Sequence, residues 1–511
     1  MNPSLRPFLF LFAVLALAAA YLGFTQSTSV DWPAFGFMVI FYALIYYVGV
    51  RAAQHKSTAA DDAEGVMLAG RSLPLYIAII TMSATWVGGG FINGTAEYTA
   101  TAGLVWVQAP WGYALSLLVG GLFFARIMRK RQYRTLLDPL EERYGKKMTA
   151  LLFLPALTGE LFWTAAILTA LGATFATVLG IDLHTAILLS AVIAIAYTAL
   201  GGLWAVALTD VVQMFILLIG LIIILPYAVG HTGGWSATWS AYQAKFGASA
   251  SLLPSRAALG NDYWTWWDYA LLLVFGGIPW QVYFQRVLSA KDEGTAVRLS
   301  LYASVICIIA ALAPAIIGMV SAVTDWSALG LTPPPEAAAT LPWVVKHLTP
   351  PIVSMIGLGA VAAAVMSSVD SSVLSASSMG IWNIYRPLIN PQVTASEIAR
   401  LIQKCIWIIG VAATLIAFNV SSVYALWFLC SDFVYCLLFP ALVCALYDPR
   451  ATWQGALAGF MVAGFLRFGG GESALGIPAF LPYGDAFPFR TLAMLAGLVT
   501  ILAVSRLTVR S

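Results

Sequence analysis

The chain has 511 residues, of which 60% are hydrophobic and 10% are charged, and its formal net charge is +3. A soluble domain carries about 25% charged residues, so this composition excludes a soluble enzyme and indicates a polytopic membrane protein. No nucleic-acid-binding motif is present, and the five cysteines show neither CxxC nor metal-ligand spacing. Nucleic acid is therefore excluded as a partner, and membrane lipid is the expected environment.

Runs of about 20 apolar residues predict membrane spans along the chain. Fourteen spans are expected, near residues 7–25, 33–51, 73–98, 103–126, 149–180, 183–201, 208–230, 267–286, 299–323, 351–379, 402–420, 423–446, 452–467 and 489–506. The span at 149–180 is long enough to tilt or to extend beyond the bilayer. The first span could instead be a signal peptide, because it ends in an alanine-rich stretch.

Lysine and arginine are distributed unevenly between the two sides of these spans. If the N-terminus is cytoplasmic, five of the 26 fall outside, namely Lys245, Arg256, Lys346, Arg467 and Arg490. Cytoplasmic loops carry an excess of these residues. The chain is therefore predicted to be a multi-pass protein of the plasma (inner) membrane, with both termini in the cytoplasm. The polar segments 231–266 and 324–350 then lie outside, and either could form a lid.

Two of the predicted spans are broken by glycine beside a tryptophan. Trp86 precedes Gly88–Gly90, and Gly276–Gly277 precedes Trp280. In lipid a freed backbone group is tolerated only where protein or a cavity satisfies it. Because one broken span leads outward and the other inward, the chain is expected to contain two repeats of opposite topology, with a transporter site at the midplane. The predicted parts are peripheral helices 1–72, repeat 73–230, outer loop 231–266, repeat 267–446 and peripheral helices 447–511.

A run of small and polar residues occupies the predicted span at 351–379. Ala364, Ser367, Ser368 and Ser371 share one helical face, and Asp370 adds a carboxylate nearby. Grouped oxygens of this kind suit Na⁺ beside the loose carbonyls of a broken helix. The alternative is small-residue helix packing, with each serine bonding back to its own helix. Asp370 and the two breaks favour the ion site.

Two further carboxylates lie in apolar spans, where a charge needs a partner or a function. Asp210 begins an outward-leading span, and it is either an ion ligand or a helix N-cap. Glu160 precedes Trp163 in another span, and its role stays unassigned.

The aromatic residues near the breaks are the candidates for substrate binding. Trp86 and Trp280 flank the breaks, and Tyr113 and Trp163 lie in other core spans. Aromatic residues commonly form belts at the membrane interfaces, but a tryptophan beside a midplane break does not fit that explanation. Tryptophan faces attract cations, and a quaternary ammonium has no N–H for a carboxylate. The pattern predicts a cage for an organic cation.

Several motifs resemble the sodium:solute symporter family and, within it, the high-affinity choline transporters. The resemblance covers roughly residues 33–505. The segments that carry it are Thr85–Glu97, Leu157–Trp163, Thr209–Gln213, Gly276–Leu288 and Ala362–Ser378.

The resemblance implies an all-α LeuT-type core of 5+5 inverted repeats and Na⁺-driven, Cl⁻-dependent choline uptake, without enzyme activity. It places the choline cage on Trp86, Tyr113, Trp163 and Trp280. It places one sodium site, called Na2, on carbonyls of Ala84, Val87 and Ala364 and hydroxyls of Ser367 and Ser368. It places a second sodium site on Asp210, Asp370 and Ser371. No motif places chloride.

Three departures from the animal members suggest a bacterial-type homologue. Phe91 stands where tyrosine is expected, the span at 7–25 is additional, and a long cytoplasmic tail is missing.

Other functions stay open beside choline import. A symporter for betaine, carnitine or proline would need a cationic group for the substrate carboxylate, and none is obvious at either break. A choline-binding sensor would need an output domain, which the sequence lacks.

Overall fold

The computed structural model describes residues 5–25, 30–55, 63–198, 203–419, 422–472, 475–484 and 486–508. These residues form helices and connecting loops, with two isolated β-bridges, Leu73 with Ala290 and Glu472 with Ile477. The α-helices are α1 (Leu5–Thr25), α2 (Trp32–His55), α3 (Ala63–Leu68), α4 (Leu75–Trp86), α5 (Gly89–Thr101), α6 (Ala109–Val119), α7 (Arg126–Lys130), α8 (Asp138–Leu179), α9 (Leu183–Thr198), α10 (Leu203–His231), α11 (Trp235–Phe246), α12 (Arg256–Leu259), α13 (Tyr263–Gly276), α14 (Gln281–Ser289), α15 (Glu293–Val323), α16 (Thr340–His347), α17 (Pro351–Met379), α18 (Ala395–Ala417), α19 (Val423–Phe433), α20 (Phe439–Tyr447), α21 (Trp453–Gly469) and α22 (Phe489–Thr508). The 3-10 turns are η1 (Ala69–Arg71), η2 (Leu104–Trp106), η4 (Gly247–Ala250), η5 (Gly260–Asp262) and η6 (Ala337–Ala339), and the π-helical stretches are η3 (Gly120–Ala125), η7 (Gly380–Ile389) and η8 (Val434–Leu438).

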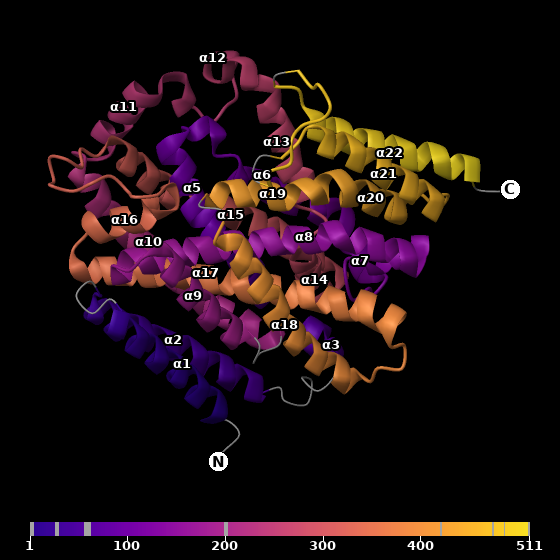
Figure 1. The fold of residues 1–511 in the computed structure, drawn as a ribbon, viewed down its shortest axis with the longest axis horizontal. Helices are drawn as coiled ribbons and strands as arrows, with labels where there is room; N and C mark the ends of the chain where they lie inside the picture. The colour runs from indigo at the N-terminus through magenta and orange to yellow at the C-terminus, as the bar shows by residue number, and fades with distance from the viewer. Residues whose placement is uncertain are drawn as a thin grey trace.

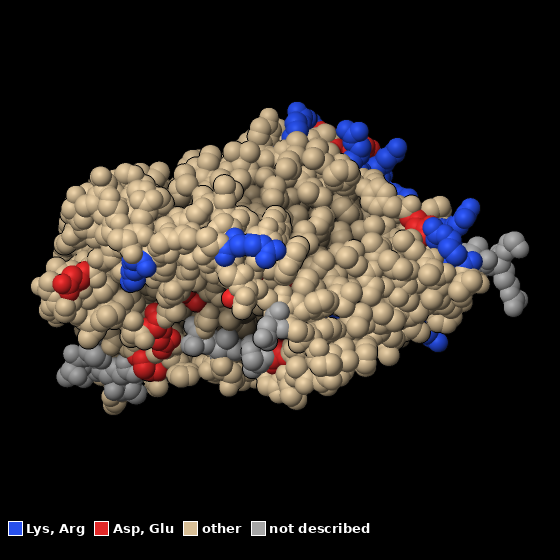
Figure 2. Space-filling model, turned by 90° about the horizontal axis from the view of Figure 1, so that it is seen from above, with Lys and Arg blue, Asp and Glu red and all other residues tan. Residues whose placement is uncertain are grey.

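The long helices surround a shared core, and α17 packs against both α8 and α10 near the centre of the molecule (Figure 1). The pair α1 and α2 covers one flank, and the pair α21 and α22 covers the opposite flank. Most of the face in Figure 2 is neither basic nor acidic. Large apolar side chains are exposed on the outer helices, including Ile222, Leu312 and Val499, each at least 60% exposed. Apolar surface of this kind fits lipid hydrocarbon rather than water.

The predicted spans all coincide with helices of the structure. Among the described residues, nine helices are long and apolar enough to cross a membrane, and the bent pair of α4 and α5 makes a tenth. Three predicted spans coincide with shorter apolar stretches, at Leu15–Phe24, Trp32–Ile45 and Leu183–Ile195, and the span at 452–467 coincides with α21, which has 17 residues. The ends of two predicted spans, at 199–201 and 420, lie outside the described residues. A multi-pass all-α membrane protein is confirmed, while the count of fourteen stays a prediction.

The long span predicted at 149–180 belongs to an even longer helix. Helix α8 has 42 residues, with a non-helical Gly145 at φ 80° and ψ 167°. At about 1.5 Å per residue, a helix of this length is about twice as long as the hydrocarbon core is thick. The whole helix is therefore too long for the hydrocarbon core, and whether the span at 149–180 tilts or extends beyond the bilayer stays a prediction.

The first glycine break separates α4 from α5 by a bend of 48°. Val87 (φ −84°, ψ 54°) leaves the helical conformation, and Gly88 is extended with ψ −171°. A Cβ atom on Gly88 would lie 1.7 Å from Ser368 Oγ, and a Cβ on Gly89 would lie 2.2 Å from Val365 Cγ2. Helix α17 therefore approaches the break to a distance that only glycine permits.

The second break separates α13 from α14 with less bending. The segment Arg256–Ser289 forms one membrane-length unit of 34 residues, and within it Trp280 is extended at φ −113° and ψ 131°. A Cβ on Gly276 would lie 2.7 Å from the carbonyl oxygen of Ser431 on α19. Glycine thus allows close backbone packing at this break as well.

The C-terminal two thirds of helix α17 are enclosed on all sides by protein. All residues from 360 to 379 are buried, although the segment carries eight serines or aspartates among its alanines and valines. A helix that is buried on every side has to satisfy its polar side chains inside the protein. The partners of those side chains decide what the helix does.

The polar segments predicted outside the membrane contain short helices. Segment 231–266 holds α11 and α12, and segment 324–350 holds α16. Tyr242 of α11 donates a hydrogen bond to the Thr99 carbonyl of α5 at 2.7 Å, and Lys245 donates to the Ala322 carbonyl at 2.6 Å. Segment 231–266 is therefore attached at one end of the broken helix α5, where a lid would have to lie.

The close approach at Gly88 generates a test of the packing. The Gly88→Ala variant places a methyl group inside the Ser368 side chain, so α4 and α17 have to separate. We expect a lower melting temperature of the purified protein and loss of solute uptake in proteoliposomes. The matched control is Gly36→Ala, because a Cβ on Gly36 meets no atom within 4 Å. Wild-type melting and uptake in the Gly88→Ala protein would contradict the packing.

Candidate substrate and ion site

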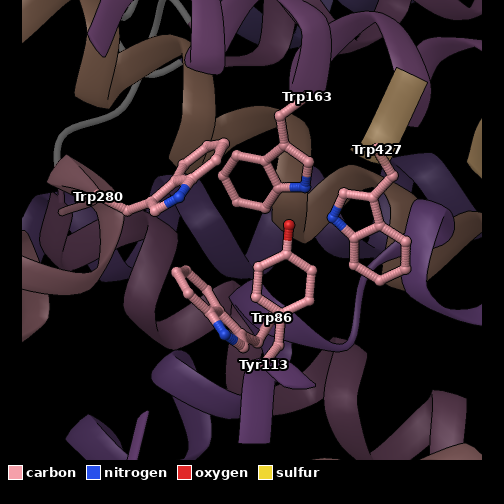
Figure 3. A pocket seen from close by; sticks show the side chains of 5 residues that line it. All are labelled: Trp86, Tyr113, Trp163, Trp280 and Trp427. Atoms are coloured by element: carbon pink, nitrogen blue, oxygen red, sulfur yellow. The ribbon is translucent and has the colours of Figure 1, made fainter. Parts of the chain in front are cut away.

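Five aromatic side chains line one small cavity beside the two breaks (Figure 3). They are Trp86, Tyr113, Trp163, Trp280 and Trp427. Trp86 ends α4, Trp280 precedes α14, and the other three come from α6, α8 and α19. The structure thus brings together the four residues predicted for the cage and adds a fifth, Trp427.

The five rings are packed against one another. The ring centroids of Trp86 lie 6.0 Å from Tyr113 and 5.9 Å from Trp163, and Trp163 lies 5.3 Å from Trp280. These three pairs meet at 68–81°, whereas Tyr113 stacks on Trp427 at 5.1 Å and 22°. The cavity volume of about 10 Å³ leaves room for about one water molecule.

The polar atoms of the cage differ in how well they are satisfied. Trp280 Nε1 donates to the Gly276 carbonyl at 2.6 Å, which fixes this ring to its own break. The Tyr113 hydroxyl forms a hydrogen bond with the Ser431 hydroxyl of α19. Trp86 Nε1 is buried and has no hydrogen-bond partner within the described part of the chain. The indole N–H of Trp86 is therefore a buried donor that meets no acceptor among the described residues.

The residues predicted for the Na2 site lie where α17 meets the end of α4. Ser367 Oγ is 3.0 Å from the Ala84 carbonyl oxygen and 2.8 Å from that of Ala364. Ser368 Oγ is 3.0 Å from the carbonyl oxygen of Thr85, which was not predicted to take part. Val87 is the first residue after α4 at the same break. This cluster offers hydroxyl and carbonyl oxygens, which suit a hard cation.

Asp210 and Ser371, predicted for the second sodium site, meet at the guanidinium of Arg286. Arg286 Nη2 donates to Ser371 Oγ at 2.5 Å and lies 3.6 Å from Asp210 Oδ2. Thr81 Oγ1 of α4 donates to the same Asp210 oxygen at 2.5 Å. Asp210 lies inside α10, which extends back to Leu203, so the N-cap alternative is wrong. Asp210 instead balances a buried cation.

Asp370 faces a different neighbour from Asp210 and Ser371. Its Oδ1 atom accepts a hydrogen bond from Thr198 Oγ1 of α9 at 2.5 Å. Its Oδ2 atom is buried and has no hydrogen-bond partner among the described residues. Adjacent helical positions differ by about 100° around the axis, so Asp370 and Ser371 point to different helices.

Glu160 is a third buried carboxylate close to the cage. It is 1% exposed, and it lies on α8 one turn before Thr164 and three residues before Trp163. Neither carboxylate oxygen has a hydrogen-bond partner within the described ranges. The core below the cage therefore contains more carboxylates than guanidinium groups.

Sequence reasoning missed two residues of this site. Trp427 lies four residues into its helix, which is the expected place of an interface belt, so nothing marked it as part of the cage. Arg286 could have been recognised from the sequence as a residue of the buried site, because an arginine in an apolar span needs a partner. The sequence did not identify Asp210 as its partner, since 76 positions separate the two on distant helices.

The fold and the site together define a membrane transporter of the LeuT type. The structure of a Na⁺-coupled sialic acid symporter in a substrate-bound outward-open state matches with a TM-score of 0.76 and 18% identity, over 93% of this chain and 98% of the other. The nucleobase-cation-symport-1 family transporter MHP1 matches with a TM-score of 0.57 and 14% identity, over 86% and 92%. These similarities establish the fold.

Residues 66–464 match the Sodium:solute symporter family, and the chain belongs to this family. It is a transporter and not an enzyme. The High-affinity choline transporter 1 of Drosophila melanogaster is 46% identical over 92% of this chain and 77% of its own length. The human High affinity choline transporter 1 is 43% identical over 92% and 84%. The Sodium/glucose cotransporter of Vibrio parahaemolyticus is 26% identical over 69% and 68%.

The buried pair of Asp210 and Arg286 generates a stability prediction. Removing one partner of a buried ion pair costs about 3–5 kcal/mol, because the other charge stays buried without compensation. We expect Asp210→Asn to lower the melting temperature of the detergent-purified protein. The Asp210→Asn/Arg286→Gln double variant removes both charges and should regain part of the loss. The single variant Arg286→Gln is measured as well. If the loss of stability in the double variant equals the sum of the losses in Asp210→Asn and Arg286→Gln, the two residues do not interact.

Proposed function

We propose that this protein imports choline together with sodium ions by alternating access, in the plasma membrane and with both termini in the cytoplasm. The observation that carries the proposal is the cavity of five aromatic rings at the junction of two broken helices. Relatives named as high-affinity choline transporters, at 43–46% identity, support the same substrate.

The cage suits a quaternary ammonium for a chemical reason. Such a cation cannot donate a hydrogen bond, and it is stabilised by ring faces within about 6 Å. Two perpendicular faces that each lie about 5 Å from one cation have centroids about 7 Å apart. The perpendicular ring pairs of the cage lie 5.3–6.0 Å apart, so they have to separate by about 1 Å or more when the cation enters. Substrate binding then includes a movement of the elements that carry the rings.

The polar groups of the cage favour choline over a zwitterion. Betaine, carnitine or proline would bring a carboxylate, and the five lining residues include no basic side chain. The buried Arg286 is already bound to Ser371 and close to Asp210. Choline brings a hydroxyl group, whose oxygen is a suitable acceptor for the unpartnered Nε1–H of Trp86.

We place one sodium ion at the break of α4. Its proposed ligands are the carbonyl oxygens of Ala84, Val87 and Ala364 and the hydroxyls of Ser367 and Ser368. The serine hydroxyls already lie within 3.0 Å of the Ala84, Thr85 and Ala364 carbonyls. An ion there would link α17 to the residues directly before Trp86, which couples sodium binding to the cage.

We place a second sodium ion near Asp210, Asp370 and Ser371. Arg286 now supplies the positive charge beside Asp210, so an ion that binds Asp210 has to compete with this guanidinium or displace it. Asp370 keeps one oxygen without a hydrogen-bond partner among the described residues, which leaves it available to a cation. Chloride dependence is part of the proposal, and no chloride site is assigned.

The membrane potential drives such a transporter strongly. Each positive charge that moves inward gains about 2.3 kcal/mol per 100 mV. Choline and Na⁺ are both cations, so the charges that they carry inward add up.

The proposed transport cycle has a fixed order of steps. Sodium at the α4 break would favour the outward-open state, and choline would then enter the cage. Closure of the outer segments would precede release to the cytoplasm.

The decisive experiment is the accumulation of labelled choline by proteoliposomes with an imposed inward Na⁺ gradient. We expect accumulation above equilibrium that stops without sodium and falls when chloride is replaced by gluconate. Betaine, carnitine and proline serve as alternative substrates in parallel. Binding without accumulation would indicate a sensor, and accumulation of a zwitterion instead of choline would overturn the substrate assignment.

The aromatic cage predicts the effect of removing one ring. Each face contributes about 0.5–2 kcal/mol, which corresponds to about a 2- to 30-fold change in affinity. Trp163→Ala and Trp280→Ala should therefore each raise the KM for choline by about 2- to 30-fold, while membrane insertion is retained. The matched control is Trp264→Ala, because Trp264 is 54% exposed. Normal choline uptake by both cage variants would exclude the cage.

The second sodium site predicts a change in sodium dependence. Asp370→Asn keeps the shape of the side chain but removes its charge, so we expect uptake to need a several-fold higher sodium concentration for half-maximal rate. The control is Asp325→Asn in the exposed outer segment. The measurement is the initial rate of choline uptake against sodium concentration. A titration identical to that of wild type would remove Asp370 from the ion site.

A further inference from the structure

A second, larger cavity lies next to the aromatic cage. Its volume is about 510 Å³, and its wall is formed by residues of α5, η2, α13, α19, α22 and the connection from α21 to α22. Under the proposed orientation this is the outer end of the protein, because α5 ends here and the polar segment 231–266 is attached to it. The cavity therefore lies on the side from which the substrate arrives.

Aromatic side chains form one part of this wall. Tyr98, Trp106, Tyr269 and Phe428 line the cavity, and each is only half-buried. The Phe428 ring lies 4.4 Å from Tyr269 and 6.3 Å from Tyr98. Rings from both halves of the fold thus converge on one space, as they do in the cage.

Charged side chains form the rest of the wall. Asp432, Glu472 and Arg490 line the cavity, and behind them lie the buried Arg467 and Asp268. Arg467 is 2.5 Å from Asp432 and 2.7 Å from Glu472, and Arg490 is 2.8 Å from Asp432. Arg490 is also 3.7 Å from Asp268, so among the described residues three carboxylates lie beside two guanidinium groups, which leaves one carboxylate in excess. An anion is disfavoured here, because both guanidinium groups are already bound to carboxylates.

Arg490 illustrates how this wall receives a cation. Its guanidinium carbon lies 4.7 Å from the Tyr269 ring centroid and 4.4 Å from that of Phe489. A delocalised cation is thus stabilised by ring faces and carboxylates together at the edge of the cavity. A small metal ion would need several free oxygen ligands, whereas Asp432 and Glu472 at this wall are already bound to Arg467 and Arg490.

A single layer of rings separates the cavity from the cage. Trp427 lines the cage, and the next residue of α19, Phe428, lines the outer cavity. Tyr424 joins them, because its ring stacks on Tyr98 at 3.7 Å and meets Trp427 edge-on at 6.1 Å. A substrate that leaves the outer cavity inward therefore meets the cage after this layer moves.

We propose that the outer cavity is a second binding site for a quaternary ammonium cation, which is occupied before the central cage. The proposal rests on the proposed function for the identity of the ligand, and its residues are distinct from those of the cage. Phe428, Tyr98 and Trp106 supply ring faces to the cation, and the excess carboxylate charge attracts it. The site raises the local concentration of the substrate and increases its rate of entry.

The test is equilibrium binding of labelled choline to the purified full-length protein in nanodiscs with sodium. We expect two choline molecules per wild-type chain, with the weaker one retained in Trp163→Ala. Phe428→Ala and Glu472→Gln should each lose the weaker site and keep the tighter one. In proteoliposomes, Phe428→Ala should raise the KM for choline about 3- to 10-fold at unchanged kcat. Phe215→Ala is the control, because this lipid-facing ring is 55% exposed.

The outcomes separate this proposal from the proposed function. One choline per wild-type chain, lost in Trp163→Ala and unaffected by both outer variants, would overturn the outer site and leave choline transport intact. A site that survives Trp163→Ala and is lost in the outer variants would support the outer site even if the cage fails. If Phe428→Ala lowers the melting temperature, the Phe428→Leu variant decides, because it removes the ring face and keeps most of the apolar volume.

Discussion

The contact between two serines of α17 and the broken end of α4 is the interaction on which the rest of this structure depends. Ser367 and Ser368 lie within hydrogen-bond distance of the carbonyl oxygens of Ala84 and Thr85, which the end of the helix leaves without helical partners. Gly88 makes this approach possible, since any side chain there would overlap Ser368. The break in turn sets the position of Trp86, and through it the cage.

This arrangement joins three requirements of a coupled transporter in a short length of chain. The carbonyls proposed as sodium ligands directly precede Trp86, which lines the aromatic cavity, so a change at one is transmitted to the other through one or two peptide units. On the next turn of α17, Ser371 contacts Arg286, whose guanidinium compensates Asp210. Burial makes an uncompensated carboxylate costly, and cations that arrive from solution are one way to balance the remaining charge.

The sequence predicted that four aromatic side chains meet beside the breaks, because glycine and tryptophan carry strong positional information inside a membrane. A glycine run within an apolar span marks a break, and a tryptophan beside it lies too deep for the interface. No glycine break lies beside Trp427, and its place close to the start of its helix is also typical of an interface residue, so the sequence did not indicate that it lines the cavity. The contact of Ser367 and Ser368 with the end of α4 was predictable for a related reason, because grouped serines on one face of a buried helix need partners. The Thr85 carbonyl was not predicted, since which carbonyl a hydroxyl meets depends on how two helices rotate against each other.

By itself, the sequence determined that this is a multi-pass helical membrane protein of the sodium:solute symporter family, with its breaks, cage tryptophans and serine face in place. The membrane class and the breaks follow from composition and local spacing, which act within a few residues, whereas the family follows from the resemblance of whole motifs. Only the tertiary structure decided that Arg286 stands between Asp210 and Ser371, that Asp370 turns to Thr198, and that Trp427 closes the cage. The physical reason is that partners of buried polar groups and packed rings are chosen by helix rotation and close approach between distant segments, which no local pattern encodes.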